Sequence, residues 1–336
     1  MTAPASERQT ADRDGFEPDG SGPDRPGPEA RGTNDALAAA AAAVRYHYDV
    51  GNEFYRLWLD TSLSYSCAMP DGPDDDLEAA QDRKLRFHLD AVNAQRAGAV
   101  LDIGCGWGAV LGRLALTHRV PRAVGLTLSI EQAAHVAAAG HPGVEVRTED
   151  WRDYEPDELF DGIISIGAFE HFARPQDSSA EKIQTYRDFF ERARSWLTAD
   201  GALSLQTIAY ANMPREQASA FMQQEIFPDA DLPTLAEITT AAEGVLETRL
   251  IRNDRLDYAW TCEQWARRLR ARRDEATGFV GPDIVARYER YLRMSALGFR
   301  SGKICLYRLV FTPYPRGYAG RATPAPASGD VKATAR

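Results

Sequence analysis

The chain has 336 residues, of which 44% are hydrophobic and 26% are charged, and its net charge is −10. This composition suits one large globular domain, or one domain with an elaborate insertion, and the acidity argues against a nucleic-acid partner. No apolar run is long enough to span a bilayer, and no secretory signal pattern is visible. The four cysteines are widely separated, which favours a reducing cytoplasm and predicts no metal site: Cys67, Cys105, Cys262 and Cys305.

Composition also divides the chain into segments. The two ends are rich in Pro, Gly, Ala and charged residues and have little to bury, so we expect disordered tails. The segments we expect are a tail at 1–33, a helical segment over the ligand at 34–98, a ligand-binding core at 99–209, a helical lid at 210–300, a closing strand at 301–315 and a tail at 316–336.

Within the core, short apolar strand patterns alternate with helical patterns. We expect strands at 99–103, 121–129, 143–150, 161–169 and 201–209, and helices at 109–118, 130–140 and 185–197. This alternation predicts an α/β fold with a parallel, doubly wound sheet. Residues 304–313 alternate polar and apolar side chains and are expected to close the sheet at one edge, after an insertion that looks mostly helical.

The first strand is followed by the glycine-rich stretch LDIGCGWGA, in which Gly104, Gly106 and Gly108 allow a tight turn and close approach of a ligand to the backbone. The spacing also fits a dinucleotide site, and a plain strand–helix turn is the other alternative. A nicotinamide enzyme would usually place an acid at the end of the second strand, where this chain has Thr127. Asp102 suits a cationic amino-acid group better than a pyrophosphate. These features favour S-adenosylmethionine.

The third and fourth strands also end in notable residues. Trp151, in TEDWRDY, is expected to stack on adenine with Asp150 near the adenine amino group, although a core tryptophan is the alternative. Glu170, in SIGAFEHF, is a carboxylate among apolar neighbours and should be costly unless it has a partner. We interpret the adjacent His171 as structural.

Several motifs together resemble the cyclopropane fatty acid synthases, particularly the mycolic acid cyclopropane synthases and their methyl-transferring relatives. The likeness runs from about residue 45 to 312 and rests on YHYDVGNEFYRLWLD, SYSCAMP, LDIGCGWGA, GLTLSIEQ, SIGAFEHF, IFPDADLP and YERYL. It implies a class I methyltransferase fold, a Rossmann-like sheet with an antiparallel last strand and a helical lid. It also implies methyl transfer from S-adenosylmethionine to an alkene carbon.

The resemblance implies cofactor contacts and an ion site. The position after Trp151 is acidic in the relatives but is Arg152 here. Residues implied to contact the cofactor are Tyr65, Ser66, Asp102, Gly104, Cys105, Gly106, Gly108, Thr127, Gln132 and Trp151. In the family a bicarbonate ion lies beside the reacting carbons, and the matching positions are Cys67, Ile166, Glu170, Gln206 and Tyr258. Four agree with the family, but Gln206 stands where the relatives have histidine.

Gln206 leaves two hypotheses open for the product. In the first, the ion is still bound through a neutral donor and the product is a cyclopropane. In the second, the ion is lost and Glu170 takes the proton, which gives a methylated alkene. Aromatic side chains would stabilise the carbocation that precedes either product, and the candidates are Phe169, Tyr210, Tyr258 and Trp260. Cys67 has a competing interpretation as a nucleophile.

The substrate also has alternatives. The resemblance implies an unsaturated acyl chain, with contact to a membrane surface or a carrier protein. IFPDADLP brings carboxylates, including Asp229 and Asp231, to an expected lid entrance, where they would disfavour an anionic headgroup. An unsaturated secondary metabolite, such as an isoprenoid or polyketide, is therefore the alternative acceptor. A cofactor-binding module without catalysis is the hypothesis from another functional class.

Overall fold

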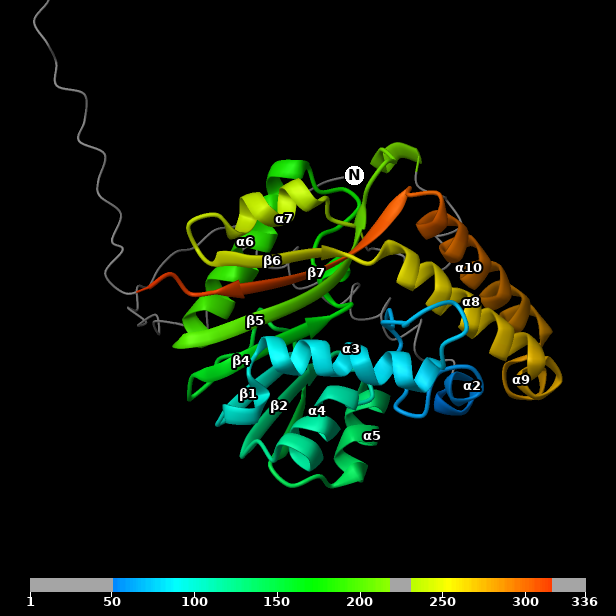
Figure 1. The fold of residues 1–336 in the computed structure, drawn as a ribbon, viewed down its shortest axis with the longest axis horizontal. Coiled ribbons are helices and arrows are strands. Elements are labelled where there is room, and N and C mark those ends of the chain that lie inside the picture. Colours follow the sequence, from blue (N-terminus) through cyan, green and yellow to red (C-terminus); the bar gives the residue numbers. More distant parts are fainter. Residues whose placement is uncertain (1–50, 218–230, 316–336) are drawn as a thin grey trace, which may run out of the picture. The chain divides into compact units, whose positions relative to one another are not determined.

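The computed structural model describes residues 51–217 and 231–315. The expected disordered tails, the start of the expected helical segment and Asp229 lie outside these residues. Within them, seven strands form one sheet in the order β3-β2-β1-β4-β5-β7-β6 (Figure 1). The strands are β1 (Ala99–Ile103), β2 (Arg122–Thr127), β3 (Val144–Thr148), β4 (Phe160–Ile166), β5 (Leu197–Tyr210), β6 (Glu247–Asn253) and β7 (Ile304–Thr312).

The first five strands are parallel and β7 is antiparallel to β5, which confirms the predicted fold class. One detail was wrong, because β7 does not lie at the edge. It is followed in the sheet by β6, which pairs with it in antiparallel register. The insertion was expected to be helical, and β6 was missed because its sequence, ETRLIRN, alternates charged residues without a buried face. Charged side chains on an edge strand discourage pairing with another chain.

Helices cover both faces of the sheet and also gather beside α2 (Figure 1). The helices and turns of the described residues are α2 (Asn52–Arg56), α3 (Leu77–Ala91), η1 (Ala94–Arg96), α4 (Ala109–Arg113), η2 (Leu114–His118), α5 (Ile130–Ala139), η3 (Phe169–His171), α6 (Ser179–Trp196), η4 (Arg215–Gln217), α7 (Leu235–Ala242), α8 (Arg255–Ala271), α9 (Arg273–Val280) and α10 (Pro282–Arg300). None of them is both long and apolar enough to cross a membrane.

Strand alternation explains the two cores beside the sheet. Val100 of β1 packs in the cluster that includes residues of α3, α4 and α5, whereas the next residue, Leu101, packs in the cluster that includes residues of α6 and α7. Successive side chains of a strand point to opposite faces, so a strand buried on both sides is apolar throughout. The run AVLDI therefore breaks this pattern only at Asp102, which is where the ligand cavity begins.

A third core joins α2 to α8 and α10. It is rich in aromatic side chains, and Trp58 meets Trp265 edge to face at 5.8 Å between ring centroids. Tyr65 continues this cluster, with its ring 5.3 Å from that of Trp58, and it also lines the ligand cavity. The aromatic core is thus continuous with the site.

Candidate active site

A cavity of about 170 Å³ lies at the carboxyl ends of β1, β2 and β4. This is the edge where open α/β sheets bind ligands. The loop before α3, one side of α3 and residues 149–152 after β3 form further parts of the wall. Of the ten predicted cofactor contacts, nine line the cavity: Tyr65, Ser66, Asp102, Gly104, Cys105, Gly106, Thr127, Gln132 and Trp151.

The glycine loop is shaped by close packing. Gly104 has a φ of 79°, and a Cβ there would lie 2.6 Å from the Cβ of Ala168, so a larger residue would displace the turn after β4. Gly108 is the exception among the predicted contacts, since it does not line the cavity. It precedes α4 with a φ of 82°, and a Cβ there would lie 2.8 Å from Cγ2 of Val136. Gly108 thus allows α4 and α5 to pack closely.

The cavity lining contains both a buried carboxyl group, Asp102, and a buried aromatic ring, Trp151. Burial raises the pKa of Asp102 to about 7, and the nearby Lys84 opposes that rise. Trp151 is buried, and the guanidinium of Arg152 lies over its ring, 4.5 Å from the centroid. Arg152 is held there by both oxygens of Asp150 at 3.3 Å and by the carbonyl of Phe172 at 2.7 Å. Arg152, where the resemblance led us to expect an acidic residue, is therefore a cation held beside the predicted adenine position.

Of the five residues of the predicted ion site, Ile166 lines this cavity, whereas the other four are buried outside its lining: Cys67, Glu170, Gln206 and Tyr258. Ile166 lines the cavity at the end of β4 and lies opposite Gln206 of β5 in the sheet. Glu170 follows on η3, and its Oε1 accepts a hydrogen bond from the backbone N–H of Ile208 at 2.6 Å. Its Oε2 is buried without a hydrogen-bond partner. The carboxyl group is therefore enclosed, and burial raises its pKa to about 7.

Arg308 of β7 connects Gln206 to Cys67. Its side chain is fully buried, and it donates through Nε to Gln206 Oε1 at 2.8 Å and through Nη2 to the carbonyl of Cys67 at 3.0 Å. Its Nη1 forms an ion pair with Asp254, the residue that precedes α8. Burial raises the pKa of Tyr258, and Cys67 and Glu170 are among the neighbours that add to the shift. The structure thus brings the five predicted residues into one region.

Comparisons with known proteins show the family of the chain. Residues 36–309 match the family described as mycolic acid cyclopropane synthetase. Cyclopropane mycolic acid synthase 2 of Mycobacterium bovis is 35% identical over 289 residues, which cover 80% of this chain and 94% of the relative. The chain belongs to this family. It is an S-adenosylmethionine-dependent methyltransferase.

Solved structures of family members align closely with the described fold. The cyclopropane synthase MmaA2 of Mycobacterium tuberculosis matches with a TM-score of 0.72 and 33% identity, over 81% of this chain and 97% of that one. The cyclopropane synthase CmaA1, in a complex with S-adenosylhomocysteine and CTAB, gives the same TM-score at 31% identity, and the alignment again covers 81% of this chain and 97% of that one.

Sequence reasoning missed three buried residues of this family member. Arg308 interrupts an apolar strand, which is itself a signal of a buried partner, and Asp254 provides that partner. His88 of α3 lies with Nε2 3.3 Å from Gln206 Oε1 and Nδ1 2.8 Å from Ser204 Oγ. Its helical position carries no such signal, because the contact depends on how α3 crosses β5.

Burial keeps the Cys67 thiol and the His171 ring uncharged at physiological pH. Burial raises the pKa of the Cys67 thiol to about 12, which keeps it protonated and disfavours a nucleophilic role. His171 lines the cavity rather than lying apart from it, and burial lowers its pKa to about 4, so the ring is neutral at physiological pH. A neutral ring can still donate one N–H hydrogen bond to a ligand, but acting as an acid would require a large rise of that pKa.

All four aromatic candidates for cation stabilisation have other contacts. Phe169 stacks on Tyr186, with 4.4 Å between ring centroids, inside the core that includes residues of α6 and α7. Trp260 donates a hydrogen bond to the carbonyl of Pro73 at 2.9 Å. Tyr210 donates a hydrogen bond to Asp231 at 2.9 Å. Tyr258, which stacks on Phe299 in the aromatic core, is the candidate that lies with the predicted ion site.

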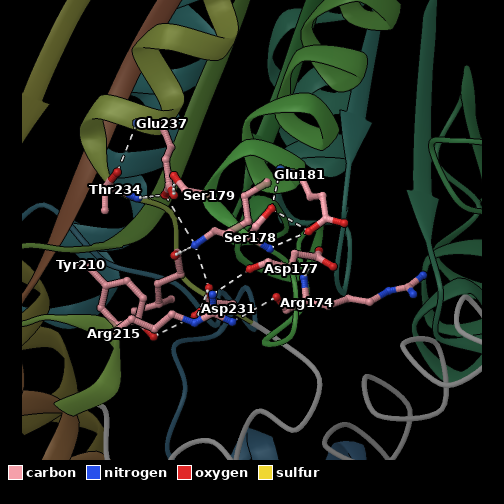
Figure 2. A network of polar contacts seen from close by, with 12 residues as sticks. Arg174, Asp177, Ser178, Ser179, Glu181, Tyr210, Arg215, Asp231, Thr234 and Glu237 are labelled. Atoms are coloured by element: carbon pink, nitrogen blue, oxygen red, sulfur yellow. Dashed lines mark hydrogen bonds and ion pairs between the residues drawn. The ribbon is translucent and has the colours of Figure 1, made fainter.

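The prediction that Asp231 repels anionic groups at a lid entrance is wrong. Its side chain is buried and pairs with Lys182 Nζ at 2.7 Å and with Arg215 Nε at 3.2 Å (Figure 2). Glu237 joins the same network, with Oε2 3.5 Å from Lys182 Nζ. A buried carboxylate that is paired with two cations contributes little negative field at the surface, so Asp231 gives no reason to exclude an anionic headgroup, and Asp229 lies outside the described residues.

Proposed function

We propose that this enzyme transfers a methyl group from S-adenosylmethionine to an alkene carbon of an unsaturated acyl chain and closes a cyclopropane ring. The observation that carries the proposal is the Glu170 carboxyl group, which is buried with one oxygen unpaired and belongs to a residue between Ala168 and His171, both of which line the cavity. Because its pKa is raised to about 7, it can exchange a proton near neutral pH. Net transfer adds one CH2 to the acceptor and releases one proton.

The residues that line the cavity would position the two reactants. An alkene is a weak nucleophile, so it reacts only when it is held in line with the methyl group. The resulting carbocation must be kept from water. The aromatic core that reaches the cavity through Tyr65 would exclude water, and Tyr258 would present a ring or hydroxyl to the positive charge.

Bicarbonate fits the residues present. Arg308 can only donate hydrogen bonds, so the oxygen of Gln206 must face it and the amide NH2 is the group left to donate elsewhere. The unpaired Oε2 of Glu170 could accept the hydroxyl hydrogen of the ion. Cys67, Ile166 and Tyr258 would complete the site. When bound, the ion would supply a small base beside the reacting carbons.

The alternative is methylation of an unsaturated secondary metabolite without ring closure, with Glu170 as the base. The raised pKa of Glu170 supports it, since a carboxylate of this kind can take a proton without an ion. In this case Gln206 would serve only to hold Arg308, which in turn holds the Cys67 carbonyl.

Deuterium labelling separates the two reactions. Purified enzyme would be incubated with S-adenosylmethionine that carries a trideuterated methyl group, first with phospholipids or carrier-bound acyl chains that contain a cis double bond and then with unsaturated isoprenoids and polyketides. Ring closure removes one deuteron from the transferred methyl group, so a cyclopropane retains two. Loss of a proton from a neighbouring carbon leaves three in a methylated alkene. No labelled product from any acceptor, with bound cofactor demonstrated, would count against alkene methylation.

The same assay tests Glu170 and the ion. We expect Glu170→Gln to lose most turnover while it still binds S-adenosylhomocysteine, since Glu170 is placed with the acceptor rather than with the cofactor. Cyclopropane formation that depends on added bicarbonate would support the ion site. A product with three deuterons, formed at the same rate with and without bicarbonate, would support Glu170 as the base.

A further inference from the structure

Lys84 is a buried cation in the cofactor cavity that none of the predicted roles uses. It lies on α3, is 2% exposed, and lines the cavity one residue before Leu85, which also lines it. Its Nζ donates one long hydrogen bond, of 3.3 Å, to Ser64 Oγ. An ammonium group has three hydrogens to donate, so this contact leaves most of its capacity unused.

No carboxylate within the described residues pairs with Lys84. In residues 51–217 and 231–315, no carboxylate oxygen lies within 4.0 Å of its Nζ. Asp60 is near enough to affect the charge, but its oxygens accept hydrogen bonds from Ser62 and Ser64 instead. Burial lowers the pKa of Lys84 to about 8, as expected for a cation without a close counter-charge.

Asp102 is the complementary feature in the same cavity. It is 2% exposed and lies close enough to Lys84 for each to shift the pKa of the other, yet the two are not in ion-pair contact. Arg152 is the other arginine or lysine in the described lining of the cavity, and it is already held by Asp150. The cavity therefore presents one uncommitted cation and one uncommitted acid, separated by a gap.

An α-amino acid group has the opposite arrangement, with an ammonium and a carboxylate on one carbon. We propose that Lys84 binds the carboxylate of the methionine moiety of S-adenosylmethionine while Asp102 binds its ammonium group. This inference rests on the proposed placement of the cofactor in the cavity. Charge-assisted hydrogen bonds inside a protein are among the stronger polar contacts, and both partners are shielded from water.

Neighbouring contacts hold the loop that carries the hydrogen-bond partner of Lys84, Ser64. Gln81, one turn earlier on α3, donates through Nε2 to the carbonyls of Ser64 at 3.2 Å and Ser66 at 2.9 Å. These bonds hold the loop of residues 63–66 against α3, and that loop forms part of the cavity wall. A site whose groups are already held loses less entropy when it binds its ligand.

Calorimetry with three ligands tests the assignment. The ligands are S-adenosylhomocysteine, its decarboxylated analogue, which keeps only the ammonium group, and methylthioadenosine, which lacks the amino-acid group. For Lys84→Met we expect about 10- to 100-fold weaker binding of S-adenosylhomocysteine. The decarboxylated analogue and methylthioadenosine should bind within about twofold of their wild-type affinity.

Asp102→Asn is the matched variant, because it should weaken both amine-containing ligands and leave methylthioadenosine unchanged. If Lys84→Met does not fold, the wild type still tests the idea, since S-adenosylhomocysteine should bind it at least tenfold more tightly than the decarboxylated analogue. Equal affinity for these two ligands, or equal losses for all three in Lys84→Met, would overturn the inference. Failure of every ligand to bind the wild type would instead overturn the proposed cofactor site.

Discussion

Replacing Glu170 with glutamine should stabilise the protein while it removes activity. The carboxyl group is buried, and its pKa is about 7 in the folded protein against an ordinary value of 4.5. A group of this kind binds its proton more tightly in the folded state. Its contribution to stability is complete below about pH 4.5 and is lost as the pH rises through about 7.

The size of the effect follows from the shift of the pKa. A shift of one unit corresponds to about 1.4 kcal/mol, so ionisation of this carboxyl costs the folded state about 3 kcal/mol at pH 8 and about 1 kcal/mol at pH 5. Glutamine keeps the acceptor for the Ile208 N–H but places an amide nitrogen where Oε2 lacks a partner. The unpaired amide nitrogen lowers the stability of the variant by the same amount at every pH. The stability difference between the variant and the wild type should therefore still change by about 2 kcal/mol between pH 5 and 8.

Urea denaturation of the wild type and Glu170→Gln at pH 5, 6.5 and 8 measures this difference directly. The variant should gain stability relative to the wild type as the pH rises, and the comparison cancels the other titrating groups that both proteins share. A stability difference that stays constant over this range would show that the carboxyl is not held at a raised pKa. The proposed role of Glu170 in proton exchange at neutral pH would then lose its physical basis.

Three further substitutions test the supporting contacts. Arg308→Met should cost about 3–5 kcal/mol in urea denaturation, because Asp254 keeps only its half-exposed partner Arg252 and the buried carbonyls of Cys67 and Ala68 lose their arginine donor, and lysine should not restore the loss; an unchanged midpoint would contradict this. Lys182→Met should cost less, about 2–3 kcal/mol, since Arg215 still pairs with Asp231, and a loss as large as that of Arg308→Met would show that Arg215 does not compensate. Gly108→Ala should cost about 1–3 kcal/mol, because the residue has a positive φ and a Cβ there would contact Val136. The folded variant should bind S-adenosylhomocysteine normally, and weaker binding would support the sequence-based prediction that Gly108 contacts the cofactor.

Much of the core could be predicted because its signals are local. The strand at Ala99–Ile103 was predicted with its exact bounds, since an apolar run stopped by a glycine leaves few alternatives. The helix α6 begins earlier than predicted, because Ser178 and Glu181 form a capping box ahead of the apolar pattern. The same box at Thr234 and Glu237 starts α7.

The parts that sequence missed depend on partners distant along the chain. Asp231 looked like an exposed acid, and only the fold shows that Lys182, 49 positions earlier, lies beside it. Arg308 and Gln206 are 102 positions apart and meet because β7 lies next to β5. The pattern of residues in one segment indicates only whether that segment forms a helix or a strand. Which residue pairs with a buried charge depends instead on how distant segments are arranged in the fold.

The orientation of Gln206 follows from this long-range contact and limits its chemistry. His88 is neutral, because burial lowers its pKa well below the ordinary value, so its two ring nitrogens must play different parts. With the Gln206 oxygen facing it, Nε2 must donate and Nδ1 must accept from Ser204. Every oxygen lone pair of Gln206 is thus directed toward Arg308 or His88. Gln206 can offer only N–H groups to a ligand, so it can hold an anion but cannot accept the proton, and that step is left to a carboxylate or to the anion itself.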